Sequence, residues 1–133
     1  MLFVFDTNVL ISATLGEGIC RQAFEIGKVN GQLVRSEETF KELAKTLEKP
    51  RLQKYLEPET KIDFLANFLK MTKLFVATET ITICRDPKDN MFLELAVSCK
   101  ANALVTRDGD LLTLHPFRGI PIITVSNFVK LFT

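Results

Sequence analysis

The stretch "LFVFDTNVL", residues 2–10, places one carboxylate inside an otherwise apolar run. Residues 2–5 are short, apolar and rich in Phe and Val, which predicts a buried strand. Asp6 follows this strand directly. A buried ionised carboxylate is costly unless a partner compensates its charge. Asp6 is therefore expected either at a strand end, where backbone groups satisfy it, or in contact with a bound cation.

The composition of the whole chain indicates one ordinary globular domain spanning residues 1–133. Hydrophobic residues make up 47% of the chain and charged residues 25%. The net charge of +1 excludes a strongly basic nucleic-acid coat but leaves room for a local basic patch. Three widely spaced cysteines, without a CxxC pair, argue against a disulfide framework or a zinc site. No apolar run reaches the roughly 18 residues of a membrane span, and no basic region of the signal-peptide type precedes the N-terminal apolar run. A cytoplasmic protein without a membrane segment is therefore expected.

Strands and helices alternate along the predicted chain. Strands are expected at 2–5, 32–36, 103–106 and 120–125, with at least one more in 74–77 or 80–84. Helices are expected from about 18 to 27–31, from 36 to 50, from 58 to 73, after the turn at 86–90, in 107–112 and after Ser126. Such alternation predicts an α/β fold, a three-layer α/β/α sandwich around a central parallel sheet. Ligands of these folds bind at the carboxyl ends of the strands.

Three local patterns add detail to this outline. Ser36 is expected to cap the helix that follows it, with an incomplete capping box because Thr39 stands where Glu is usual. Ser126 is expected to cap the last helix. The 58–73 helix carries two apolar stripes, which indicates either a deeply buried helix or one stripe that faces the core and one that faces a protein partner. The partner surface is favoured, for a second copy in a homodimer or for an antitoxin. The stripes are Ile62, Leu65, Ala66 and Leu69, and Phe64, Phe68 and Met71.

Acidic residues follow several of the predicted strands. Asp6 follows 2–5, Asp86 and Asp89 follow 80–84, and Asp108 and Asp110 follow 103–106. Taken singly, an acid at a helix start is usually an N-cap. Taken together, acids at three strand ends favour a hard divalent cation, Mg²⁺ or Mn²⁺, which suits all-oxygen ligands. Such sites hydrolyse phosphodiesters.

Four segments carry a family resemblance that runs almost end to end and in order. They are "FDTNVLISA" at 5–13, "ETFKELAKTLEKPRLQKYL" at 38–56, "CRDPKDNMFLELAV" at 84–97 and "ALVTRDGDLL" at 103–112. The chain resembles the PIN-domain family, in particular its prokaryotic VapC-like branch of toxin components from toxin–antitoxin pairs. The resemblance implies a PIN-like fold and an endoribonuclease that uses Mg²⁺ or Mn²⁺ to hydrolyse single-stranded or structured RNA.

The resemblance also implies roles for particular residues. The four family acids fall on Asp6, Glu42, Asp89 and Asp108, with Asp110 as an additional metal ligand. Thr7, Asn8 and Thr106 match polar positions that support these acids by hydrogen bonding. Two positions remain open: a spacing common among the toxins puts the third acid on Asn90 instead of Asp89, and periodicity alone places Glu42 on the solvated face of its helix.

Basic residues accumulate beside these acids, and they are candidates for RNA contacts. They are Lys45, Lys49, Arg51, Lys54, Arg85 and Arg107. Two other functions stay open. A haloacid-dehalogenase-like phosphatase also begins with Asp after its first strand, but its second Asp is replaced by Asn8. A catalytically weakened PIN-like domain that binds RNA or protein is the main alternative.

Overall fold

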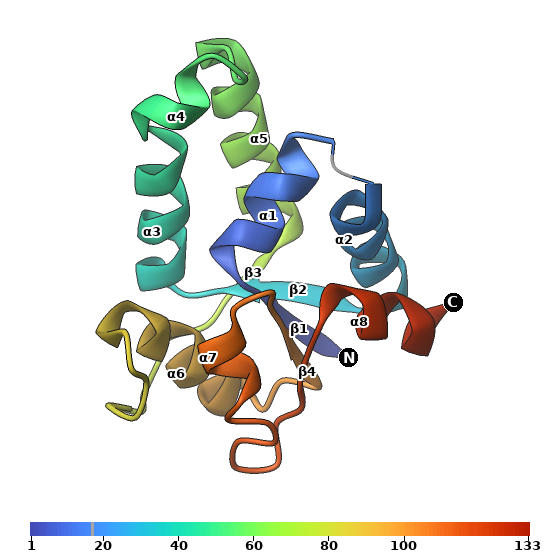
Figure 1. The fold of residues 1–133 in the computed structure, drawn as a ribbon, viewed down its shortest axis with the longest axis vertical. Helices are drawn as coiled ribbons and strands as arrows, with labels where there is room; N and C mark the ends of the chain where they lie inside the picture. The colour runs from blue at the N-terminus through green and yellow to red at the C-terminus, as the bar shows by residue number, and fades with distance from the viewer. Residues whose placement is uncertain (17) are drawn as a thin grey trace.

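The computed structural model describes residues 1–16 and 18–133 and contains a five-stranded sheet in which all paired strands are parallel (Figure 1). The strand order is β3-β2-β1-β4-β5. The strands are β1 (Leu2–Phe5), β2 (Gln32–Arg35), β3 (Lys73–Leu74), β4 (Ala103–Val105) and β5 (Ile122–Ile123). The predicted α/β/α fold with a parallel sheet is therefore confirmed.

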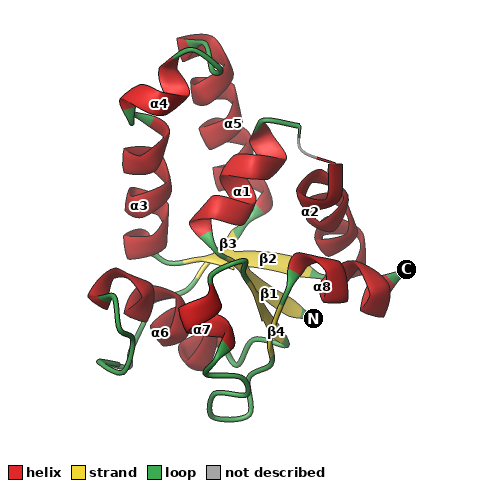
Figure 2. Ribbon diagram, in the orientation of Figure 1, coloured by secondary structure: helices red, strands yellow, loops and turns green. Residues whose placement is uncertain are grey.

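Alternating side chains of β1 enter two different cores. Phe3 and Phe5 pack with the helices on one face of the sheet, whereas Val4 packs on the other. The first face carries α1 (Thr7–Thr14), α2 (Gly18–Asn30), α3 (Glu37–Leu47), α4 (Pro50–Gln53), α5 (Pro58–Met71) and α8 (Val125–Phe132). The second carries α6 (Asn90–Cys99) and α7 (Gly109–Leu112), as Figure 2 shows.

The register of the sheet brings the ends of β1 and β4 together. Phe5 lies opposite Val105, and the backbone N–H of Asp6 donates to the carbonyl of Val105 at 2.9 Å. Asp6 and Thr106 therefore lie side by side, directly after the central strand β1 and its neighbour β4. Since parallel strands end at the same edge, this pairing sets the place of the candidate site.

Two segments add to or differ from the sequence-based outline. Thr7–Thr14 forms helix α1, whose apolar residues are buried on most sides. Of the two segments expected to hold at least one strand, the first overlaps β3 at Leu74, whereas 80–84 forms no strand. There the backbone bonds to side chains instead of a neighbouring strand: the N–H of Ile81 donates to Glu94 at 2.8 Å, and the N–H of Cys84 donates to Asn90 at 2.9 Å.

Helix α5 buries one of its two apolar stripes. Phe68 is 4% exposed and Phe64 and Met71 pack beside it, whereas Ile62 is 65% exposed and Leu69 is 42% exposed. Three members of the other predicted stripe, Ile62, Ala66 and Leu69, are exposed, whereas its fourth member, Leu65, is half-buried and packs against the core. No helix in the described part of the chain is long and apolar enough to cross a membrane.

Two predicted helix caps are corrected by the structure. The capping box at Ser36 is complete, because the Thr39 hydroxyl accepts from the Ser36 N–H at 2.9 Å while Ser36 Oγ accepts from the Thr39 N–H at 3.1 Å. A threonine hydroxyl can thus replace the usual Glu. Thr124, not Ser126, caps α8, and its side chain accepts from the Asn127 N–H.

Replacing Ser36 by Ala is expected to lower the free energy of unfolding by about 1 kcal/mol at this buried helix start, because the Ser36 hydroxyl no longer accepts from the Thr39 N–H or donates to Thr39 Oγ1. Urea denaturation followed by circular dichroism measures this loss. Ser126→Ala is the matched control, with an expected change within about 0.5 kcal/mol because Ser126 is exposed and caps nothing. Equal losses in both variants would contradict the assignment of the caps.

Candidate active site

A polar cavity of about 240 Å³ opens where β1 and β4 end. It lies among the starts of α1 and α6, the body of α3 and the turn before α7. Five carboxylates and three basic side chains line it, so its charge is predominantly acidic. The lining residues are Asp6, Thr7, Asn8, Glu42, Thr46, Lys49, Arg51, Asp86, Lys88, Asp89, Phe92 and Asp108.

Asp6 lies at the floor of this acidic cavity and is 5% exposed. Thr106 Oγ1 donates a hydrogen bond to Asp6 Oδ2 at 2.7 Å. Thr106 Oγ1 also accepts a hydrogen bond from the Asp108 N–H at 2.9 Å. Burial raises the pKa of Asp6, the hydrogen bond from Thr106 opposes that rise, and the charges of Asp108 and Glu42 add to it. Thr106 thus joins two of the predicted acids.

Asp89 is the second acid in the acidic cavity whose pKa is raised. Desolvation, together with a hydrogen bond and charge repulsion from Asp108, raises the pKa of Asp89 to about 7. Asp6 and Asp86 add smaller repulsions of the same sign. Two carboxyl groups that share a site cannot both ionise freely, and a bound cation relieves this repulsion.

Capping explains only some of these acids. The side chain of Asp108 accepts from the Asp110 N–H at the start of α7, and that of Asp86 accepts from the Lys88 N–H at the start of the 3₁₀ helix Pro87–Asp89. Asp6 and Asp89 also occupy N-cap positions, but neither side chain makes a capping hydrogen bond. Asp6 instead interacts with the Thr106 hydroxyl and the Thr7 backbone, and Asp89 interacts with Asp108, so a standard cap does not explain either carboxylate.

The alternative third acid, Asn90, has a different environment. Asn90 is 9% exposed, and its Oδ1 accepts from the backbone N–H of Cys84 at 2.9 Å. It does not line the acidic cavity, whereas Asp89 does. The structure thus places the carboxylate at 89 among the acids and uses the amide at 90 to hold the 80–84 segment.

Glu42 lines the acidic cavity from α3, on a face that periodicity alone reads as solvated. It is half-buried because α6 and the start of α1 stand opposite that face. Thr46, one helical turn later, donates to the Glu42 carbonyl at 2.8 Å and lies within 3.4 Å of its carboxylate. The sequence analysis missed Thr46, although its i+4 spacing from Glu42 was a usable signal.

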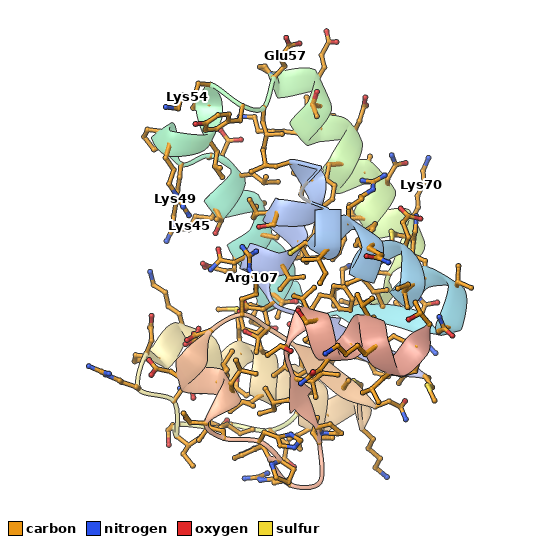
Figure 3. All side chains as sticks on the ribbon, turned by 45° about the vertical axis from the view of Figure 1, so that its right-hand side comes forward. Lys45, Lys49, Lys54, Glu57, Lys70 and Arg107 are labelled. Carbon is orange, nitrogen blue, oxygen red and sulfur yellow. The ribbon has the colours of Figure 1, made fainter. Side chains whose placement is uncertain are left out.

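Some predicted residues lie outside the acidic cavity. Asp110 is exposed and does not line it. Among the basic candidates, Lys49 and Arg51 line it, joined by Lys88, while Lys45, Lys54, Arg85 and Arg107 do not. In Figure 3, Lys45, Lys49 and Arg107 lie where the upper helices meet α6 and α7, whereas Lys54 lies near the far end of α4.

The donor set fits a hard cation that keeps part of its water shell. Within residues 1–16 and 18–133, no three Asp, Glu, His or Cys side chains are close enough to form a complete metal cage. Mg²⁺ needs fewer, since it usually binds one or two carboxylates and retains several waters. Thr7 Oγ1 is buried in the lining and has no hydrogen-bond partner, as expected of a group that faces a water or ion.

Replacing Thr106 by Val is expected to weaken Mn²⁺ binding by about 10- to 100-fold, since the hydroxyl that orients Asp6 and holds the Asp108 backbone is lost. Isothermal titration calorimetry measures the affinity. Thr113→Val is the control, because the Thr113 hydroxyl bonds only within α7, to the Asp110 carbonyl. A Thr106→Val protein that folds and binds Mn²⁺ like the wild type would contradict the role of this hydroxyl.

Comparisons with known proteins agree with this architecture. A 118-residue match to an uncharacterized protein of Methanocaldococcus jannaschii is 33% identical and covers 84% of this chain and 74% of that protein. The crystal structure of VapBC2 from Rickettsia felis, bound to a DNA fragment from its promoter, aligns with a TM-score of 0.65 at 15% identity, over 93% of this chain and 98% of that one. The sequence profile of the PIN domain matches residues 3–110. The chain therefore belongs to the PIN domain family.

Proposed function

We propose that this protein is a Mg²⁺- or Mn²⁺-dependent endoribonuclease that hydrolyses phosphodiester bonds of RNA. The observation that carries the proposal is the gathering of Asp6, Glu42, Asp89 and Asp108 around one cavity at the carboxyl ends of the central strands. Two of these acids, Asp6 and Asp89, make no capping bond, and the pKa of each is raised. Groups with perturbed pKa values in a cleft are typical of catalytic sites.

Each residue has a role in this proposal. Asp6, Asp89 and Asp108 surround the ion, one or two of them as direct ligands and the rest through waters that the ion retains. Asp110 supports Asp108 through its backbone N–H rather than as a ligand. When bound, the ion supplies an activated water and neutralises charge on the leaving oxygen. Glu42 accepts a proton from the attacking water at its carboxylate, and Thr106 orients Asp6 and the Asp108 backbone. The Thr7 hydroxyl and the Asn8 side chain face the waters around the ion. Asn90 keeps the 80–84 segment in place.

The basic residues around the acidic cavity bind the RNA backbone in this proposal. Lys49, Arg51 and Lys88 line the cavity, so they are placed to contact the phosphates beside the cleaved bond. Lys45, Lys54, Arg85 and Arg107 extend the positive surface beyond it. The carboxylates at the floor of the cavity repel a phosphate group, because both are negatively charged. The cation must therefore bind before the phosphate of the RNA can enter.

The proposed cellular role is that of a toxin in a toxin–antitoxin pair acting in the cytoplasm. The fold shared with the VapBC2 structure supports this role. The outward stripe of α5, with Ile62 and Leu69 exposed, is the surface proposed for a protein partner, either an antitoxin or a second copy in a dimer.

A binding domain without catalytic activity is the second candidate. It is favoured by one observation: the described carboxylates do not form a complete three-ligand cage. Such a domain would hold RNA through its basic residues without needing a divalent ion.

The two candidates differ in a cleavage assay. Purified protein is mixed with labelled single-stranded RNA in Mn²⁺, in Mg²⁺ or in EDTA, with single-stranded DNA of the same sequence as a second substrate. Cleavage of RNA in metal but not in EDTA is the expected result. RNA that is bound but uncut in every metal, together with no Mn²⁺ binding by calorimetry, would favour the binding domain.

A further inference from the structure

A second hollow, of about 610 Å³, lies next to the acidic cavity between α1, α4 and the start of α7. The two cavities share Asn8, Arg51 and Asp108 in their linings. Their walls differ, because the second hollow replaces most of the carboxylates with Ile11, Leu15 and Leu52 and adds Arg107. Its volume is within the range of about 300–1,000 Å³ typical of small-ligand sites.

Arg107 is held in a fixed position at the edge of this hollow. Its Nη2 donates to Ser12 Oγ at 2.9 Å, and its Nη1 donates to Cys20 Sγ at 3.5 Å. Ser12 is 5% exposed and Cys20 is fully buried, so both partners belong to the rigid interior of α1 and α2. A guanidinium that is already immobilised loses little side-chain entropy when it binds an anion.

We propose that this hollow is a subsite for one unstacked nucleotide of single-stranded RNA, next to the phosphate that enters the acidic cavity. The inference rests on the proposed nuclease function, since it assigns the nucleotide that flanks the cleaved bond. Arg51 and Arg107 contact its phosphate, and the walls formed by Ile11, Leu15 and Leu52 contact its base. Lys49 and Arg51 then connect the two cavities along one backbone path.

The chemistry of the hollow favours a nucleotide over other ligands. It combines two guanidinium groups with one accessible apolar side chain, Leu15, backed by the buried Ile11 and Leu52, and with Asp108 where it meets the acidic cavity. This pairing of cation and apolar surface matches a ligand that carries both a phosphate and a flat face. A base in an A-form duplex is paired and stacked, so it is not free to turn out of the helix into the hollow. The subsite therefore selects single strands, loops or bulges over continuous duplex.

Binding of a fluorescent single-stranded RNA oligonucleotide tests the subsite without requiring cleavage. All proteins carry Asp6→Asn, and fluorescence anisotropy compares added Arg51→Ala, Leu15→Trp and Lys70→Ala changes. Arg51→Ala should weaken binding about tenfold, the usual effect of losing a charged hydrogen bond. Leu15→Trp should weaken it similarly by filling the hollow. Lys70→Ala removes a charge from the opposite side of the molecule (Figure 3) and should change binding less than about threefold.

The outcomes separate this inference from the proposed function. Wild-type hydrolysis of bis(p-nitrophenyl) phosphate in Mn²⁺ reports on catalysis alone. Arg51 lines both cavities, whereas Leu15 lines the second hollow and not the acidic cavity, so loss of RNA binding in Leu15→Trp as well as in Arg51→Ala would support the subsite. It would do so even if that ester were not hydrolysed, in which case only the nuclease proposal fails. Equal effects of Arg51→Ala and Lys70→Ala, or no binding of single-stranded RNA, would overturn the subsite. Because Arg51 is exposed on α4, its variant serves if Leu15→Trp does not fold.

Discussion

Asp6→Asn is expected to lower metal-dependent RNA cleavage by at least about 100-fold. Mutating a residue that hydrogen-bonds to a metal ligand typically lowers activity about 10- to 100-fold, and loss of the ligand itself should lower it further. The substitution removes a charge at the floor of the acidic cavity and little else. The amide oxygen of Asn can still accept the hydrogen bond from Thr106, so the ends of β1 and β4 stay connected. Cleavage of labelled RNA in Mn²⁺, at equal protein concentration, measures the effect.

The same variant should fold at least as stably as the wild type when no metal is present. Burial raises the pKa of Asp6, so above the pKa of an unfolded Asp this carboxyl group destabilises the metal-free fold, which a neutral Asn does not do. Thermal unfolding in EDTA checks this, and adding Mn²⁺ should raise the melting temperature of the wild type only. Undiminished cleavage by Asp6→Asn would indicate a contaminating ribonuclease or a site elsewhere, and it would remove the role proposed for Asp6.

The parts of the fold that were predicted correctly are those with a strong period or a clear boundary. The buried strand at 2–5 and the helix α6, with its stripe of Phe92, Leu95, Ala96 and Cys99, both follow from the spacing of apolar residues. Helix α1 could not be predicted in this way. It is apolar on most sides and directly follows a strand of the same composition, so neither a period of two nor one of 3.6 stands out.

The acidic site shows a similar division between local and tertiary information. Acids that follow β1 and β4 could be placed at one edge of the sheet because parallel strands end together. Asp89 reaches the same edge by another route, since 80–84 is irregular and the acid ends the 3₁₀ helix Pro87–Asp89, directly before α6. Glu42 could be found only through the family resemblance, because what lies opposite the polar face of α3 is a tertiary property.

The assignment of the third acid leads to the second large effect. Asp89→Asn is expected to lower metal-dependent RNA cleavage by about 100-fold, whereas Asn90→Ala should retain activity within about tenfold and instead lose about 1–2 kcal/mol of stability, since the N–H of Cys84 loses its acceptor. Asp89 and Asn90 are adjacent in the chain, but their side chains lie in different environments. Asp89 lines the acidic cavity, whereas Asn90 accepts a hydrogen bond from the backbone of Cys84. The reverse result, with Asn90 controlling cleavage and Asp89 controlling stability, would move the third acid to position 90.

Stability as a function of pH supplies an independent measurement on Asp89→Asn. The pKa of Asp89 is raised to about 7 in the folded chain, against about 3.9 for an unfolded Asp. Between these values the folded state binds more protons than the unfolded state, so the stability of the metal-free wild type falls as pH rises from about 4 to about 7. Asp89→Asn lacks this loss. In EDTA it should therefore unfold at a higher temperature than the wild type near pH 8, and the difference should shrink as pH falls toward 4. A difference that stays constant with pH would mean that Asp89 carries no raised pKa, and that the acids of the cavity do not repel one another as their arrangement requires.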